Sequence, residues 1–212
     1  NVTDYEFPNY ISDDSILVTK KSYKEISAFY LLTNGKEKKI RVKDLVIDDY
    51  YSYKNGKVVY AAYQSDERWG NQDYSVIKLL DIYTGQQKQI TYKSKYFSPD
   101  INEDGTEILA VQVNPDGTNN LCRIDAASGK IIRQFSYRDN YFFTQSKYIN
   151  ANTAVSAARN PEGNMVLLKI NLATGGYENL TPYSFNVIGF PFVKGDTVYF
   201  TAMNNNADKI FA

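Results

Sequence analysis

The sequence predicts an all-β fold, a β-propeller built of four-stranded antiparallel blades. Two features of the 212-residue chain support this prediction: turn signals recur at nearly constant spacing, and short apolar runs lie between them. Apolar residues at helical spacing are absent over any useful length. A unit of roughly 45 residues with four short strands is typical of a propeller blade.

Three series of turns define the repeat. The first consists of Thr/Ser/Asn-Gly turns between two strands, at Gly35, Gly85, Gly129 and Gly175, with spacings of 50, 44 and 46 residues. In the second, Asn-Pro-Asp-Gly at 114–117 recurs as Asn-Pro-Glu-Gly at 160–163. The third precedes a strand in each unit and comprises 55–56, 104–105, 150–152 and 195–196. Gly and Asn supply the positive φ that such hairpins need.

We therefore divide the single domain, residues 1–212, into blades near 4–43, 44–92, 93–136 and 137–182, with a partial fifth at 183–212. Because the fifth unit stops inside its third strand, we expect the chain to be part of a larger propeller. The alternative is that residues 1–5 supply the missing outer strand and close a five-bladed ring. Open blade edges favour self-association.

Composition argues against several functions. Lys plus Arg and Asp plus Glu both number 24, so the basic excess expected of a general nucleic-acid binder is missing. There is no histidine, which removes Ser-His and Cys-His nucleophile pairs and histidine-ligated zinc. We expect no catalysis by this chain and assign it no cofactor or metal. The single cysteine, Cys122, is predicted to be structural, and no apolar run is long enough for a transmembrane helix.

One segment carries a family resemblance. "SPDINEDGTEILAVQVNPDGTNNLCRIDAASGK", residues 98–130, resembles the repeat of TolB-like bacterial propellers, also called the WD40-like or PD40 repeat. The second blade matches at Asp81, Thr84 and Gly85, whereas the first, fourth and fifth match in strand layout without the Ser-Pro-Asp core. The resemblance implies a protein that is exported to the periplasm or cell surface and binds a protein partner.

The Ser-Pro-Asp motif at 98–100 has two interpretations. A reactive serine beside a carboxylate is one of them. The favoured interpretation is structural: the proline presets φ, and the Asp100 carboxylate bonds nearby backbone amides, tying the inner strand to its turn.

The predicted contact site is the loop "RWGNQDY", residues 68–74. The equivalent connections of the third and fourth blades are tight turns, but here the second blade inserts extra residues, including the only tryptophan. Long loops on a rigid scaffold often carry binding function, and Trp, Arg and Tyr often dominate binding energy. We predict binding through Arg68, Trp69, Gln72, Asp73 and Tyr74. The competing interpretation is that Trp69 folds back and caps the core of a neighbouring blade.

Other residues are expected on the same face. Propeller geometry brings the loops between second and third strands together with the connections between blades. Those connections contribute Tyr96, Tyr137, Arg138 and Tyr141, some of which are expected to pack between blades instead.

These observations lead to three hypotheses for the function of the chain. The leading hypothesis is a non-catalytic scaffold that binds a protein partner. The second is an accessory, substrate-gating propeller of an exported peptidase whose catalytic residues lie outside these 212 residues. The third is a glycan-binding propeller.

Overall fold

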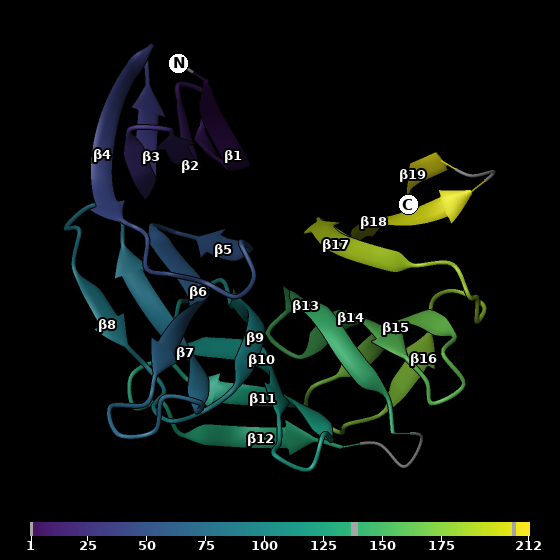
Figure 1. Cartoon of the computed structure of the whole chain (residues 1–212). Coiled ribbons are helices and arrows are strands. Elements are labelled where there is room, and N and C mark those ends of the chain that lie inside the picture. The colour runs from purple at the N-terminus through teal and green to yellow at the C-terminus, as the bar shows by residue number, and fades with distance from the viewer. Residues whose placement is uncertain (1, 137–139, 205–206) are drawn as a thin grey trace.

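The computed structural model describes residues 2–136, 140–204 and 207–212, and within these ranges the chain is all β (Figure 1). In these ranges, nineteen strands form five antiparallel sheets, four with four strands and the last with three, arranged as a five-bladed propeller. The predicted fold class is confirmed. The blade boundary expected at residue 137, together with Tyr137 and Arg138, lies outside the described residues.

Each sheet is formed by strands that are consecutive in the sequence. The first sheet contains β1 (Thr3–Ser12), β2 (Ser15–Ser22), β3 (Glu25–Thr33) and β4 (Lys36–Val42). The second contains β5 (Tyr51–Lys54), β6 (Lys57–Ser65), β7 (Asp73–Asp81) and β8 (Gln87–Gln89). The third contains β9 (Tyr96–Ile101), β10 (Glu107–Val113), β11 (Asn119–Asp125) and β12 (Ile131–Phe135). The fourth contains β13 (Phe142–Asn150), β14 (Thr153–Arg159), β15 (Met165–Asn171) and β16 (Tyr177–Asn179), and the fifth β17 (Ile188–Lys194), β18 (Thr197–Asn204) and β19 (Ala207–Phe211).

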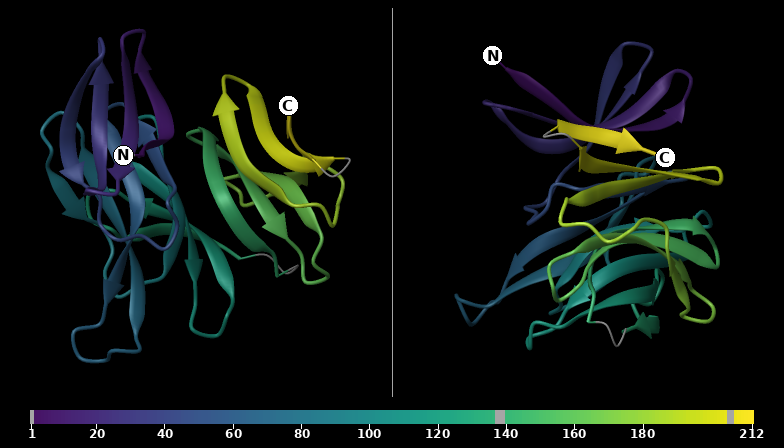
Figure 2. Two further views of the ribbon diagram at one scale, coloured as in Figure 1. Left: turned by 45° about the horizontal axis from the view of Figure 1, so that its top comes forward. Right: turned by 90° about the vertical axis from the view of Figure 1, so that its right-hand side faces the viewer.

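The sheets follow one another around an axis, with the first strand of each innermost (Figures 1 and 2). Residues 3–5 belong to β1, which pairs with β2 as the inner strand of the first sheet. The alternative in which the N-terminal residues form the outer strand of the fifth blade is therefore wrong. Across the described residues, no strand ladder joins the first sheet to the fifth.

The predicted hairpin glycines have the positive φ that a tight reversal requires. Gly129, between β11 and β12, has a φ of 72° and lies directly over the preceding blade. A Cβ atom at this position would lie 2.0 Å from the backbone oxygen of Ile90, which leaves no room for a side chain. Gly35, in the equivalent hairpin of the first sheet, has a similar φ of 73° but open space around it.

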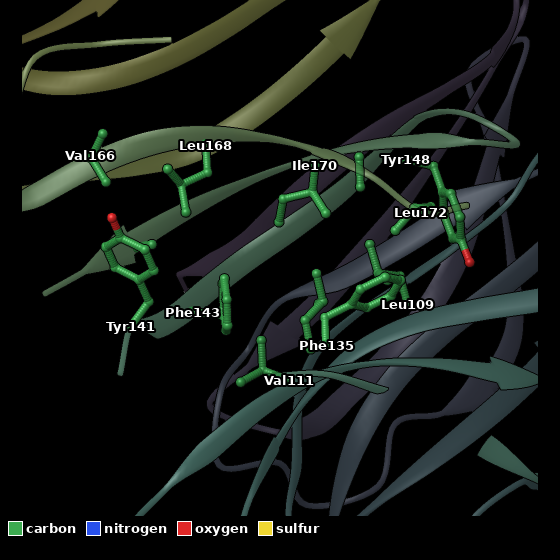
Figure 3. Close-up of a cluster of buried hydrophobic side chains, with 13 residues drawn as sticks. Leu109, Val111, Phe135, Tyr141, Phe143, Tyr148, Val166, Leu168, Ile170 and Leu172 are labelled. Atoms are coloured by element: carbon green, nitrogen blue, oxygen red, sulfur yellow. The ribbon is translucent and has the colours of Figure 1, made fainter. Parts of the chain in front are cut away.

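The core lies between the sheets, because successive side chains of a strand point to opposite faces. In β14, Ala154 and Ala158 pack toward the third sheet, while Val155 and Ala157 pack toward the fifth. Figure 3 shows the cluster between the third and fourth sheets, in which aliphatic side chains surround the ring of Phe143. Each middle blade is thus covered on both faces by apolar neighbours.

A bulge recurs in the inner strands. Phe7, Ser98, Gln145 and Phe190 have φ between 45° and 51°, in the left-handed region that non-glycine residues rarely adopt. Each lies where the pairing of its inner strand with the next strand shifts register. Bulges bend a strand and redirect its side chains. The same irregularity therefore recurs in β1, β9, β13 and β17.

The Asp100 carboxylate joins three blades. It is 1% exposed and accepts hydrogen bonds from the Ser52 hydroxyl of the second blade and from the Tyr148 backbone N–H of the fourth, at 2.8 Å. The Lys147 ammonium lies 3.1 Å from the same carboxylate. The prediction that Asp100 bonds the amides of its own turn is wrong, since Asn102 performs that role by accepting two backbone N–H groups of the turn.

The two terminal sheets have different outer faces. On the first sheet, Tyr30 is only 7% exposed, because Lys20 and Lys39 cover its ring with ammonium groups 5.1 Å and 6.0 Å from the centroid. On the fifth sheet, Met203 and Ile210 lie on the face turned away from the fourth blade and are 45% and 76% exposed. One end is capped by amphipathic side chains and the other presents apolar surface to solvent.

Candidate binding site at the Trp69 loop

The loop between β6 and β7 is held in one shape by a single carboxylate. Asp66 Oδ1 accepts hydrogen bonds from the backbone N–H groups of Arg68 and Trp69, at 2.9 and 3.0 Å. The Asp66 N–H donates to the Gln72 carbonyl, and the Gln72 N–H donates to the Trp69 carbonyl, both at 2.9 Å. A short polar side chain that bonds the backbone just ahead of it is a common way to order a turn.

The other oxygen of Asp66 anchors the loop to the blade. Oδ2 accepts a hydrogen bond from the Tyr74 hydroxyl at 2.8 Å, and Tyr74 is 9% exposed within the core between the first and second sheets. The N–H of Arg68, the Tyr74 hydroxyl and the N–H of Trp69 together lower the pKa of Asp66 below its ordinary value. The loop is therefore ordered best when Asp66 is ionised. Sequence reasoning missed Asp66, although an aspartate two residues before an insertion is a recognisable turn signal.

Trp69 points away from the cores. Its side chain is 59% exposed, so the interpretation in which it caps a neighbouring blade is wrong. The Arg68 guanidinium carbon lies 5.0 Å from the centroid of the Trp69 ring, within the range of a cation–π contact. The two side chains form an exposed pair on a loop whose backbone is already fixed.

A pocket of about 450 Å³ lies beside this loop, between the second and third blades. Of the predicted contact residues, Gln72, Asp73 and Tyr74 line it, whereas Arg68 and Trp69 do not. The remaining lining residues come from the same loop, from the connection between the two blades, and from the end of β10 with the turn that follows it: Asn71, Lys93, Ser94, Lys95, Gln112, Val113, Asn114, Pro115 and Gly117. The β6–β7 loop of the second blade and the β10–β11 turn of the third therefore lie on the same face of the propeller.

The pocket wall combines fixed and free polar groups. The Tyr63 hydroxyl donates to Asp73 Oδ1 at 2.5 Å, which holds that carboxylate in place. Lys93 and Lys95 are exposed, and no ion pair to either is present among the described residues. Sequence reasoning missed these two lysines. The sequence signal that could have found them is the Lys-Ser-Lys run, residues 93–95, in the connection between two blades.

Two other tyrosines expected at this face, Tyr96 and Tyr141, are packing residues. Tyr96 and Tyr141 are each 4% exposed. The Tyr141 hydroxyl contacts that of Tyr183 in the next blade connection, and its ring meets Tyr177 edge-on at 5.7 Å. They stabilise contacts between elements and are unavailable to a partner.

Cys122 is structural, as predicted. It is fully buried in β11, and its Sγ lies 3.5 Å from the Gln112 side-chain oxygen. Burial raises the pKa of the thiol to about 12, so the nucleophilic thiolate is not formed near neutral pH. Residues 2–136, 140–204 and 207–212 contain no helix long and apolar enough to cross a membrane.

Comparison with known proteins identifies the fold. No protein-family model matches the chain, and no curated protein sequence matches it significantly. Among solved structures, TolB from Acinetobacter baumannii superposes with a TM-score of 0.63 at 17% identity, over 91% of this chain and 49% of that one. A prolyl endopeptidase gives a TM-score of 0.65 at 9% identity, over 98% of this chain and 33% of that one.

A third similar structure is the β-propeller domain of the trilobed protease from Pyrococcus furiosus, described as having an open velcro topology. It superposes with a TM-score of 0.57 at 12% identity, over 99% of this chain and 82% of that one. The chain therefore has a TolB-like propeller fold that also occurs in peptidases, and it spans about half the length of the A. baumannii protein.

Proposed function

We propose that this chain is a non-catalytic propeller scaffold of an exported bacterial protein, and that it binds a protein partner through the face carrying the Trp69 loop. The observation that carries the proposal is the exposed Arg68–Trp69 pair on a backbone fixed by Asp66. Trp and Arg are the residues most often found to dominate protein interfaces. A loop that is already ordered loses little conformational entropy on binding.

The adjoining pocket supports the same proposal. It offers amide side chains and the two lysines within reach of a partner that covers Trp69. Such a surface combines an aromatic anchor with a polar rim, the usual arrangement of a protein interface.

Site-specific cross-linking tests this function. We would replace Trp69 with the photoreactive p-benzoylphenylalanine and irradiate the protein in cell-envelope extract of the source organism. The matched control carries the same group at Tyr83, which is 65% exposed on the β7–β8 hairpin at the other end of the blade. We expect a defined cross-linked partner from position 69 only. In a pull-down without the photoreactive group, recovery of that partner should fall when Arg68 and Trp69 are both replaced with alanine.

Equal cross-linking from both positions, or unchanged recovery by the double alanine variant, would contradict the proposed site. A melting curve of each variant guards against misfolding. Since both side chains are exposed, we expect melting within about 2 °C of the parent protein.

The similarity to a prolyl endopeptidase and to the trilobed protease favours one alternative, an accessory propeller that gates substrate entry to a peptidase. Sequencing the gene that encodes this chain distinguishes the two functions. A hydrolase segment with a Gly-x-Ser-x-Gly motif in the same reading frame would favour the peptidase.

A further inference from the structure

A second hollow lies on the axis of the propeller, and we call it the axial channel. Its volume is about 700 Å³, within the usual range of small-molecule sites. The innermost strands β1, β9, β13 and β17 contribute to its wall, as do β5 and the residue before it. The lining residues are Pro8, Asn9, Tyr10, Tyr50, Tyr51, Ser52, Tyr53, Lys54, Asp100, Lys147, Tyr148, Phe192, Val193 and Lys194.

Aromatic rings supply the apolar part of this wall. Tyr10 of the first blade and Phe192 of the fifth are 67% and 59% exposed, although both line the channel. The second blade adds Tyr50 and Tyr53. The exposed rings of Tyr10 and Phe192 offer stacking surface for a flat or apolar group, whereas the Tyr50 ring already has the Lys147 ammonium 4.4 Å from its centroid.

The charged groups of the wall are unequal in number. Three lysines, Lys54, Lys147 and Lys194, line it with one carboxylate, Asp100. Asp100 is already occupied by the Ser52 hydroxyl, the Tyr148 N–H and the Lys147 ammonium, so Lys147 and Asp100 neutralise one another.

Two ammonium groups are left over. Lys54 lies 3.4 Å from Glu103, whose side chain is 70% exposed, and such a surface pair contributes little. No ion pair to Lys194 is present in the part of the chain that the structure describes. The Tyr10 hydroxyl donates a hydrogen bond at 2.6 Å to Asp13, which does not line the channel. The channel wall therefore has two cations without a buried counter-charge.

We propose that the axial channel is a second binding site, separate from the Trp69 face, and that its ligand is a small organic carboxylate with an aromatic body. The rings hold the body, and Lys54 and Lys194 hold the carboxylate through charge-assisted hydrogen bonds. Such a ligand would contact the first and fifth blades together, because Tyr10 and Phe192 lie on these two blades. Binding should then stabilise the protein, since those two sheets are joined by no ladder among the described residues.

Matched probes test this site on the intact chain. We would measure binding of naphthalene-2-carboxylate by calorimetry at low salt, and compare it with the neutral naphthalene-2-carboxamide. We expect the carboxylate to bind about tenfold more tightly, and to raise the melting temperature at saturation. Replacing both Lys54 and Lys194 with glutamine should remove the preference for the carboxylate and leave the carboxamide affinity unchanged.

Two control variants make the result specific. Lys93→Gln with Lys95→Gln removes the same charge from the opposite face and should leave both affinities unchanged. Phe192→Ala should weaken both probes alike, because it removes stacking surface and no charge. Failure of naphthalene-2-carboxylate to bind at millimolar concentration, equal affinity for the two probes, or an unchanged preference in the Lys54/Lys194 variant would overturn the proposal.

Discussion

Replacement of Asp100 with alanine tests how neighbouring blades are held together at the axis. The change removes a buried carboxylate that bonds the second and fourth blades. It leaves the Lys147 ammonium, whose side chain is 10% exposed, without its counter-charge. Removing one partner of a buried ion pair typically costs about 3–5 kcal/mol, so we expect unfolding free energy to fall by about 4 kcal/mol.

The loss is large relative to the stability of a domain. Total unfolding free energies are usually about 5–15 kcal/mol. For a domain of this size, each kcal/mol corresponds to about 2–4 °C, which predicts a melting temperature lower by about 8–16 °C. Asp100→Asn keeps an acceptor for the Tyr148 N–H and loses only the charge, so it should cost less, about 2 kcal/mol.

Urea unfolding monitored by circular dichroism measures both variants. The matched control is Asp104→Ala in the adjacent turn, because Asp104 is exposed and should change stability by less than about 0.5 kcal/mol. A double-mutant cycle of Asp100→Asn with Lys147→Met should give a coupling energy of about 1–3 kcal/mol. If Asp100→Ala proved as stable as Asp104→Ala, or the cycle showed no coupling, the inner-strand ion pair would not be what joins these blades.

Three further outcomes are expected. Gly35→Ala and Gly129→Ala should both lower the urea midpoint, because φ is positive at both positions and backbone strain alone costs ~1–2 kcal/mol. Gly129→Ala should cost clearly more, since its Cβ would lie 2.0 Å from a backbone oxygen. Equal midpoints for the two variants would contradict the close packing of the Gly129 hairpin. Cys122, with its thiol pKa raised to about 12, should not react with a disulfide reagent at pH 8 until the protein is unfolded, and rapid labelling of native protein would refute this. Folding lowers the pKa of Asp66, so its stabilisation of the loop should be complete above the ordinary aspartate pKa and disappear as pH falls through the lowered pKa. Fluorescence of Trp69, the single tryptophan, should report this acid transition. The Asp66→Ala variant should show no such transition.

Much of the architecture follows from the sequence alone. Turn glycines and the Asn-Pro-Asp/Glu-Gly motifs impose chain reversals at fixed spacing, because positive φ and preset proline φ are local properties. Short apolar runs between the turns then allow only antiparallel strands of similar length. These local constraints determined the repeated hairpins and the insertion that carries Trp69.

Contacts between blades were decided only by the tertiary structure. Asp100 bonds residues about 48 positions away in either direction, so no local pattern reveals its partners. The same holds for the pocket between Gln72 and Lys93, and for the axial channel, whose wall draws on five strands distant in sequence. A turn depends on the φ preferences of a few adjacent residues, whereas a site between blades depends on how rigid sheets pack, and that packing brings together side chains that the sequence keeps apart.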